Sequence, residues 1–164
     1  MIGRPAALAL LFVTAAAAEE PLQLNPFNDP FVQATTSVRA CPTPRGPAYT
    51  EAELRQEAHY RVERGTSCWL AGRCSEPNAY RYDTGIAKGV VAALRADASL
   101  AAGSAIWVIA ERRFVTLQGC VANAAQSARA EALARAVADV EVVIPVLAVP
   151  GEQPRYAVRP RADR

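Results

Sequence analysis

The hydrophobic positions in the second half of the chain follow two clear periods. Spacings of three and four residues predict helices over residues 83–96 and 123–138, with inward positions at Ile86, Val90, Ala93, Leu94, Ala134 and Val137. Alternation of apolar and polar residues predicts strands over residues 105–111, 114–121 and 140–149. Pro145 lies inside the third strand, which indicates an edge position or a bulge.

This order of elements indicates the fold class. Helix, strand, strand, helix and strand over residues 83–149 predict an α+β fold of two layers, with both helices on one face of a three-stranded mixed sheet. A unit of about 65 residues is marginal for such a fold by itself. We therefore expect the rest of the chain to support it.

The preceding residues, 19–82, show no core of their own. Residues 19–47 are rich in Pro, Asn, Asp and Thr and are expected to be irregular. Thr50, followed by Glu53, has the spacing of a capping box and predicts a helix over residues 51–64 that ends at Gly65. The helix has a thin apolar stripe, so it needs a tertiary partner or a disulfide. Residues 19–82 are therefore expected to form a helical extension that is tethered to the second half.

Residues 1–18 have the pattern of a secretory signal peptide. Arg4 precedes an apolar run that is too short to span a bilayer, and the run ends in the small residues of a cleavage site. The alternative is a buried apolar helix of a cytosolic protein. Export would place the protein in an oxidising compartment, where an even count of four cysteines favours two disulfides. The alternatives are a zinc site, although the cysteine spacing does not suit one, and free or redox-active thiols.

Composition and charge limit the classes of partner. The formal net charge of the 164 residues is +2, without a basic stripe, which argues against nucleic acid as the main partner. We find no phosphate loop, no metal motif, no catalytic constellation and no sign of a cofactor or small-molecule substrate, and a lone His59 is a weak candidate for a general base.

The second half resembles the BON domain, a family named for bacterial osmotically induced and nodulation proteins. The matching blocks are VVAALRADASL at 90–100, IWV at 106–108, VTLQGCV at 115–121, and the patterns over 128–137 and 140–149. Three positions depart from the family pattern, namely the turn Arg112-Arg113, Asp139 where the family usually has Gly, and Pro145. The resemblance implies a non-enzymatic, exported module of the bacterial envelope that binds phospholipid surfaces or serves larger envelope proteins.

The sheet face away from the helices is expected to be covered. Trp107, Ile109 and Phe114 point to that face, together with Cys120, and such an apolar face would not stay bare. We expect the extension to fold over it, with Trp69 or Leu70 packed against Trp107 or Phe114. Three cysteine pairings are possible, and the simplest joins Cys68 to Cys74 and Cys41 to Cys120.

Two functions remain in contention, and each has candidate residues. The first is a periplasmic protein that binds anionic phospholipid surfaces and supports envelope integrity, and its headgroup candidates come from the turn and from a flexible tail over residues 150–164: Arg112, Arg113, Arg155, Arg159 and Arg161. The second is an interaction or accessory module of an envelope assembly. A secreted enzyme or thiol-redox protein is a third and weaker hypothesis, which requires accessible free thiols.

Overall fold

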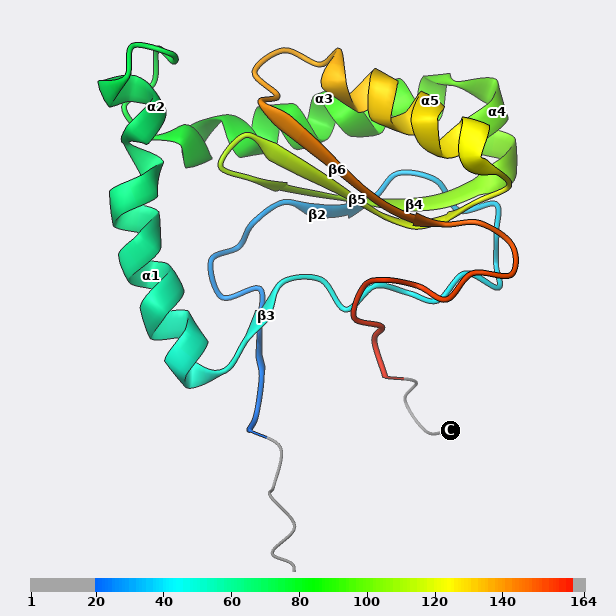
Figure 1. Ribbon diagram of the computed structural model, residues 1–164, viewed down its shortest axis with the longest axis horizontal. Helices are drawn as coiled ribbons and strands as arrows, with labels where there is room; N and C mark the ends of the chain where they lie inside the picture. Colours follow the sequence, from blue (N-terminus) through cyan, green and yellow to red (C-terminus); the bar gives the residue numbers. More distant parts are fainter. Residues whose placement is uncertain (1–19, 161–164) are drawn as a thin grey trace, which may run out of the picture.

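A computed structural model describes residues 20–160, so the predicted signal peptide lies outside the described residues. The main sheet has the strand order β2-β4-β5-β6 (Figure 1), formed by the strands Phe31–Gln33, Ser104–Glu111, Phe114–Val121 and Val142–Ala148. Neighbouring strands are antiparallel except β5 and β6, which are parallel. The mixed sheet confirms the predicted α+β class.

Helices cover one face of this sheet. They are α3 (Asp83–Ala96), the short α4 (Ala98–Gly103) and α5 (Ala124–Arg135), and Figure 1 shows them together above the strands. The core between the layers contains the predicted apolar positions of both strands and helices, among them Ile86, Val90, Leu94, Ile106, Val108, Val115, Leu117 and Ala134. The side chain of Asp97 accepts hydrogen bonds from the N–H groups of Ser99 and Leu100, so a new helix begins where the sequence suggested only an end of α3.

The fourth strand of the sheet comes from the extension. The sequence analysis treated residues 31–33 as irregular, but they pair with β4 at the edge of the sheet. Arg95 holds the chain just after this strand by donating to the carbonyls of Ala34 at 2.9 Å and Gln33 at 3.0 Å. Three residues without a clear alternation give no strand pattern, so only this non-local pairing reveals the strand.

The remainder of the extension forms an arm beside the sheet. It contains α1 (Glu51–Gly65), α2 (Ser67–Leu70), the 3₁₀ helix η1 (Ala79–Tyr82) and the small pair β1 (Gln23–Leu24) and β3 (Ala48–Tyr49). The capping box of Thr50 and Glu53 is present as predicted. Arg61 joins α1 to the rest of the fold, because its guanidinium pairs with the buried Asp29 and lies 3.7 Å from a carboxylate oxygen of Glu111 on β4.

A two-residue turn joins β4 to β5. Arg112 and Arg113 both have positive φ values, 53° and 66°, a conformation that usually favours Asn or Gly. The buried carboxylate of Asp83 accepts hydrogen bonds from both backbone N–H groups at 2.7 Å. Asp139 also has a positive φ, 68°, at the position where the family usually has Gly. At these three positions the backbone adopts a conformation that favours glycine, although none of the residues is glycine.

The sheet face opposite the helices is covered by a different part of the extension from the one expected. Trp107 is buried with Cys41 and Ala105, and Phe31 and Val38 pack on this cluster. Trp69 and Leu70 lie on α2 and are 48% and 74% exposed, so the predicted packing of either on Trp107 or Phe114 is wrong. The segment around Cys41 covers the face because the disulfide to Cys120 holds it there.

The strand β6 forms the second edge of the sheet, which is one of the two positions that Pro145 indicated. Beyond β6, the described residues 150–160 turn back under the sheet and pair with the extension, and Tyr156 is buried there. The expectation of a flexible tail is therefore wrong for residues 150–160, because their pairing partner lies more than 110 positions away and leaves no local pattern. Arg161 and the following residues lie outside the described part.

Candidate functional site

A disulfide begins the site by fixing the extension to the sheet. Cys120 lies on β5, on the face away from the helices, and its bond to Cys41 closes a loop with a sequence separation of 79 residues. The second disulfide joins Cys68 to Cys74. This is the pairing that the sequence analysis gave as the simplest, and it leaves none of the four cysteines free.

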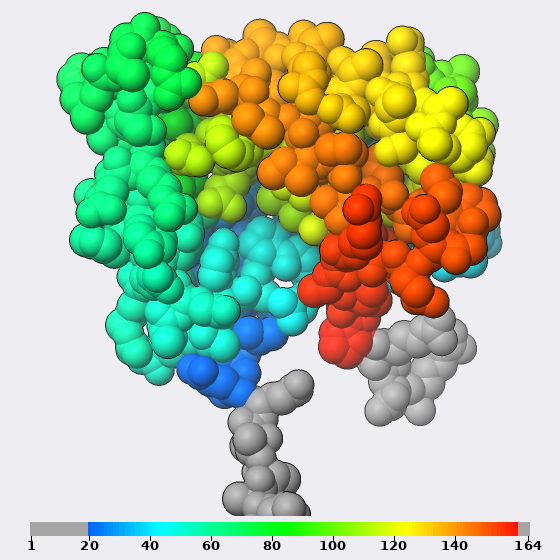
Figure 2. All heavy atoms as spheres, viewed as in Figure 1, coloured from blue at the N-terminus to red at the C-terminus, as the bar shows by residue number. Residues whose placement is uncertain are grey.

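The C-terminal residues then pack against the segment that Cys41 anchors. The backbone N–H of Arg45 donates to Ala157 O at 2.8 Å, and that of Arg159 donates to Thr43 O at 2.9 Å. Tyr156 is 8% exposed, and its hydroxyl donates to Pro42 O at 2.9 Å. Burial raises the pKa of this hydroxyl above its ordinary value. The two segments therefore form one ordered layer below the sheet, shown in cyan and red in Figure 2.

Arginines are concentrated in this layer. Residues 34–48 and 150–160 contain four arginines and one carboxylate, namely Arg39, Arg45, Arg155, Arg159 and Glu152, although the whole chain is nearly neutral. Arg39, Arg155 and Arg159 are exposed, and within residues 20–160 none of the three forms an ion pair. Arg45 differs, because it is half-buried and lies close to the carboxyl of Glu53, whose pKa is lowered mainly by hydrogen bonds with Thr50 and further by the Arg45 charge.

Two of these arginines line one cleft. Arg39 and Arg159 both line it, and its volume of about 540 Å³ has no carboxylate in the lining. The remaining lining residues are Ala40, Cys41, Pro42, Thr43, Gln153, Pro154, Val158 and Pro160. We refer to it as the arginine cleft. Guanidinium groups with free donors are suited to phosphate and carboxylate oxygens, so the cleft can bind an anionic group.

An apolar cleft adjoins the arginine cleft. Its volume is about 660 Å³, and Glu152 is the one charged residue in its lining. The two clefts share five lining residues, namely Ala40, Cys41, Pro42, Gln153 and Pro154. Most of the other apolar lining comes from the ends of β5 and β6, including Val121, Ala148 and Val149. A cationic region next to an apolar one is suited to an amphiphilic anion.

The predicted headgroup residues do not gather at one place. Arg159 lines the arginine cleft and Arg155 lies exposed nearby, while Arg112 and Arg113 belong to the turn between β4 and β5. The side chain of Arg113 is 12% exposed and donates to Asp139 O at 2.7 Å, so it holds the loop before β6. Arg112 stacks over the ring of Phe114 at 4.6 Å and is half-buried.

Arg39 is the residue that the sequence analysis missed. It stands two positions before Cys41, so the expected bridge from Cys41 to Cys120 was a signal that it lies below the sheet. Nothing in the sequence showed that Arg159 returns to the same place. The cleft depends on the backbone pairing of residues more than 110 positions apart, which has no local pattern.

Two features are absent from residues 20–160, the part of the chain that the structure describes. In that part of the chain no helix has the length and apolar character needed to cross a membrane. The same residues hold no group of three or more His, Cys, Asp or Glu side chains that could bind a metal ion.

Comparison with known proteins gives one match. The model of the BON domain family matches residues 82–151, from the end of η1 to the turn after β6. No curated protein and no solved structure matches the chain. The matched segment contains all the elements of the resemblance, in the same order. Residues 82–151 of this chain therefore match the BON domain family, and the rest of the chain lies outside the match.

Proposed function

We propose that this protein is a non-enzymatic component of the bacterial cell envelope that binds anionic phospholipid surfaces. The observation that carries the proposal is the arginine cleft, which Arg39 and Arg159 both line and whose lining contains no carboxylate. The BON domain supports the proposal, because the family is associated with phospholipid binding and envelope roles and is generally non-catalytic.

The chemistry of the cleft favours headgroup phosphates. Each basic residue near an anionic membrane surface contributes about 1 kcal/mol, so Arg39, Arg155 and Arg159 together give a weak and reversible contact. Such a contact is screened by salt, because the Debye length is about 8 Å at physiological ionic strength. The apolar cleft at the side would receive the part of an acyl chain nearest to the headgroup.

The proposed location is the periplasm. Two disulfides suit an oxidising compartment, and one of them ties the extension to the BON domain. The signal peptide predicted over residues 1–18 agrees with export and remains a prediction.

A second candidate function is an accessory module that binds another envelope protein. It is favoured by β6, because this strand forms an edge of the sheet and its residue Ile144 is 43% exposed. A partner strand could pair along such an edge, although Pro145 lacks the N–H group of one ladder position.

Vesicle co-sedimentation tests the main proposal. The oxidised protein is mixed with phosphatidylglycerol-containing vesicles or with phosphatidylcholine vesicles, at low and at physiological salt. We expect a preference for the anionic vesicles that weakens with salt, and the double variant Arg39→Gln/Arg159→Gln should lose most of that preference. The matched control is Arg55→Gln/Arg135→Gln, which removes the same charge from exposed helix positions.

Two results would overturn this assignment. One is equal sedimentation with both kinds of vesicle. The other is an equal effect of the two double variants, which would show that binding depends on the total charge of the protein and not on the arginine cleft. Specific capture of an envelope protein, together with indifference to lipid, would favour the accessory module.

A further inference from the structure

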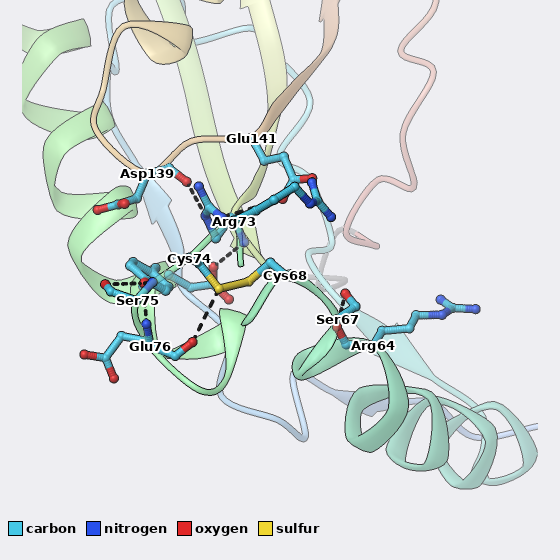
Figure 3. A network of polar contacts seen from close by, with 12 residues as sticks. Arg64, Ser67, Cys68, Arg73, Cys74, Ser75, Glu76, Asp139 and Glu141 are labelled. Atoms are coloured by element: carbon cyan, nitrogen blue, oxygen red, sulfur yellow. Dashed lines mark hydrogen bonds and ion pairs between the residues drawn. A yellow bond between two sulfur atoms is a disulfide. The ribbon is translucent and has the colours of Figure 1, made fainter. Parts of the chain in front are cut away.

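The tip of the arm exposes an unusual apolar pair. Trp69 and Leu70 are 48% and 74% exposed, and they lie in an uncharged run of eight residues from Gly65 to Gly72. Arg64 precedes this run and Arg73 follows it, and both are exposed. Figure 3 shows Arg64, Arg73 and the disulfide that closes this part of the chain. We call residues 65–74 the tip.

Four consecutive backbone donors of the tip are paired within this part of the chain. Their N–H groups donate to carbonyls three to five residues back: Leu70 to Thr66 at 3.0 Å, Ala71 to Ser67 at 3.1 Å, Gly72 to Trp69 at 2.9 Å and Arg73 to Cys68 at 2.8 Å. Unpaired backbone donors are the main obstacle to placing a loop in an apolar medium. The tip meets this requirement for the four donors that follow Trp69.

The tip is also held in shape. Cys68 is 2% exposed, so the disulfide to Cys74 fixes the inner side of the turn while the next two side chains point outward. Arg73 forms an ion pair with Glu141 at 2.9 Å, and the hydroxyl of Ser67 donates to Arg64 O at 2.8 Å. A rigid tip loses little conformational freedom on binding.

We propose that the tip is a second lipid-contact site, in which Trp69 and Leu70 enter the interfacial region of a phospholipid bilayer. Trp is favoured at this depth, because its ring is apolar and its N–H reaches the wet side. Arg64 and Arg73 flank the uncharged run, and Arg73 is held by Glu141, so the Arg64 guanidinium is the group that would lie at the level of the headgroup phosphates. This charge arrangement selects a lipid surface over an apolar pocket of a protein.

The tip is independent of the arginine cleft. Figures 1 and 2 place α2 at the upper left and residues 150–160 below the sheet and right of centre, so the two sites lie on separate parts of the molecule. The inference therefore goes beyond the proposed function, and either can fail without the other.

Fluorescence quenching by brominated lipids tests the inference. The chain has two tryptophans, and Trp107 is 8% exposed within the sheet-face cluster. With brominated phosphatidylcholine vesicles, which carry no net charge, we expect quenching and a blue shift in the wild-type protein. Both changes should vanish in Trp69→Phe and persist in Arg39→Gln/Arg159→Gln.

A matched pair of surface variants measures the contribution of the apolar contact. Leu70 and Val62 are both 74% exposed, but Val62 lies on α1 outside the tip. Leu70→Ser should lower partitioning onto vesicles about tenfold, and Val62→Ser should leave it unchanged. Absence of quenching in the wild-type protein, quenching that persists in Trp69→Phe, or equal effects of the two serine variants would overturn the inference. Binding to anionic vesicles without quenching would support the arginine cleft and overturn the tip as a lipid-contact site. Quenching without a preference for anionic vesicles would support the tip and overturn the role of the cleft.

Discussion

The hydroxyl of Tyr156 donates a hydrogen bond to the carbonyl of Pro42 at 2.9 Å, across 114 positions of sequence. This contact joins the end of the chain to the segment anchored by the Cys41–Cys120 disulfide. It supports the backbone pairing that brings Arg159 and Arg39 into the lining of the arginine cleft. The cleft therefore rests in part on a buried aromatic side chain that is not in its lining.

We predict that Tyr156→Ala separates the tail from the rest of the protein without unfolding the BON domain. Loss of a buried Tyr removes packing and the bond to Pro42, so residues 155–160 should become protease-sensitive. Anionic vesicle binding should fall toward the level of Arg39→Gln/Arg159→Gln. Tyr156→Phe is the control, since it keeps the ring and should retain most of the binding. Wild-type binding by Tyr156→Ala would show that the tail need not be ordered.

Asp83 is predicted to make stability depend on pH. Desolvation by burial raises its pKa to about 6, although the N–H groups of Arg113 and Arg112 act in the opposite direction. The folded protein therefore holds a proton on this carboxyl between about pH 4 and pH 6, where the unfolded chain does not. Protonation of Asp83 therefore adds to the free energy of unfolding. The added stability is fully present below about pH 4 and is lost as the pH rises through about 6. Its upper limit is about 3 kcal/mol.

Denaturant titrations at pH 4.5 and pH 7 check this sign. The measured quantity is the free energy of unfolding of the wild type minus that of Asp83→Asn. This difference should be larger at pH 4.5 than at pH 7, because Asn cannot take up the proton. Asp83→Ala should lose about 1–3 kcal/mol at pH 7, because the turn N–H groups lose their acceptor. A pH profile of Asp83→Asn parallel to the wild type would place the Asp83 pKa at its ordinary value.

Gly119 is predicted to be the glycine that tolerates substitution least. Its φ is +133°, and a Cβ atom there would lie 2.0 Å from the backbone O of Ala105 on β4. Gly119→Ala must therefore separate β4 and β5 in the middle of the sheet, and a loss of more than about 2 kcal/mol is expected. The control is Gly85→Ala on α3, where a Cβ meets nothing within 4 Å and should be neutral or stabilising. Equal thermal midpoints of the two variants would contradict the prediction.

Local signals account for the parts of the fold that the sequence predicted. The capping box at Thr50 and the alternation in β4 and β5 act within a few residues, so they can be read directly. The turn at Arg112 shows the limit, because the carboxylate that satisfies it belongs to Asp83, 29 positions away. A turn without glycine gave no hint of this acceptor.

The candidate site was harder to predict than the fold for the same reason. Arg159 was predicted as a headgroup residue. Arg39 can be recognised as a second lining residue of the cleft only from the pairing of the tail with the extension. Hydrophobicity gave a wrong expectation as well: Trp69 or Leu70 was predicted to cover the open sheet face because apolar residues are usually buried, yet both lie exposed at the tip. An exposed apolar pair on a disulfide-closed turn is itself a sign of a binding surface.

The positions of the two lipid-contact sites predict that the protein links vesicles. The tip and the arginine cleft lie on separate parts of the molecule, so we expect one protein to engage one bilayer through the tip and another through the cleft. Anionic vesicles mixed with the wild-type protein should therefore cluster, which light scattering measures, and high salt should reverse the clustering because the cleft contact is screened. Leu70→Ser and Arg39→Gln/Arg159→Gln should each abolish clustering although each retains one contact, whereas Val62→Ser should cluster like the wild type. Clustering that persists in either deficient variant would mean that protein self-association, and not the two sites of one molecule, joins the vesicles.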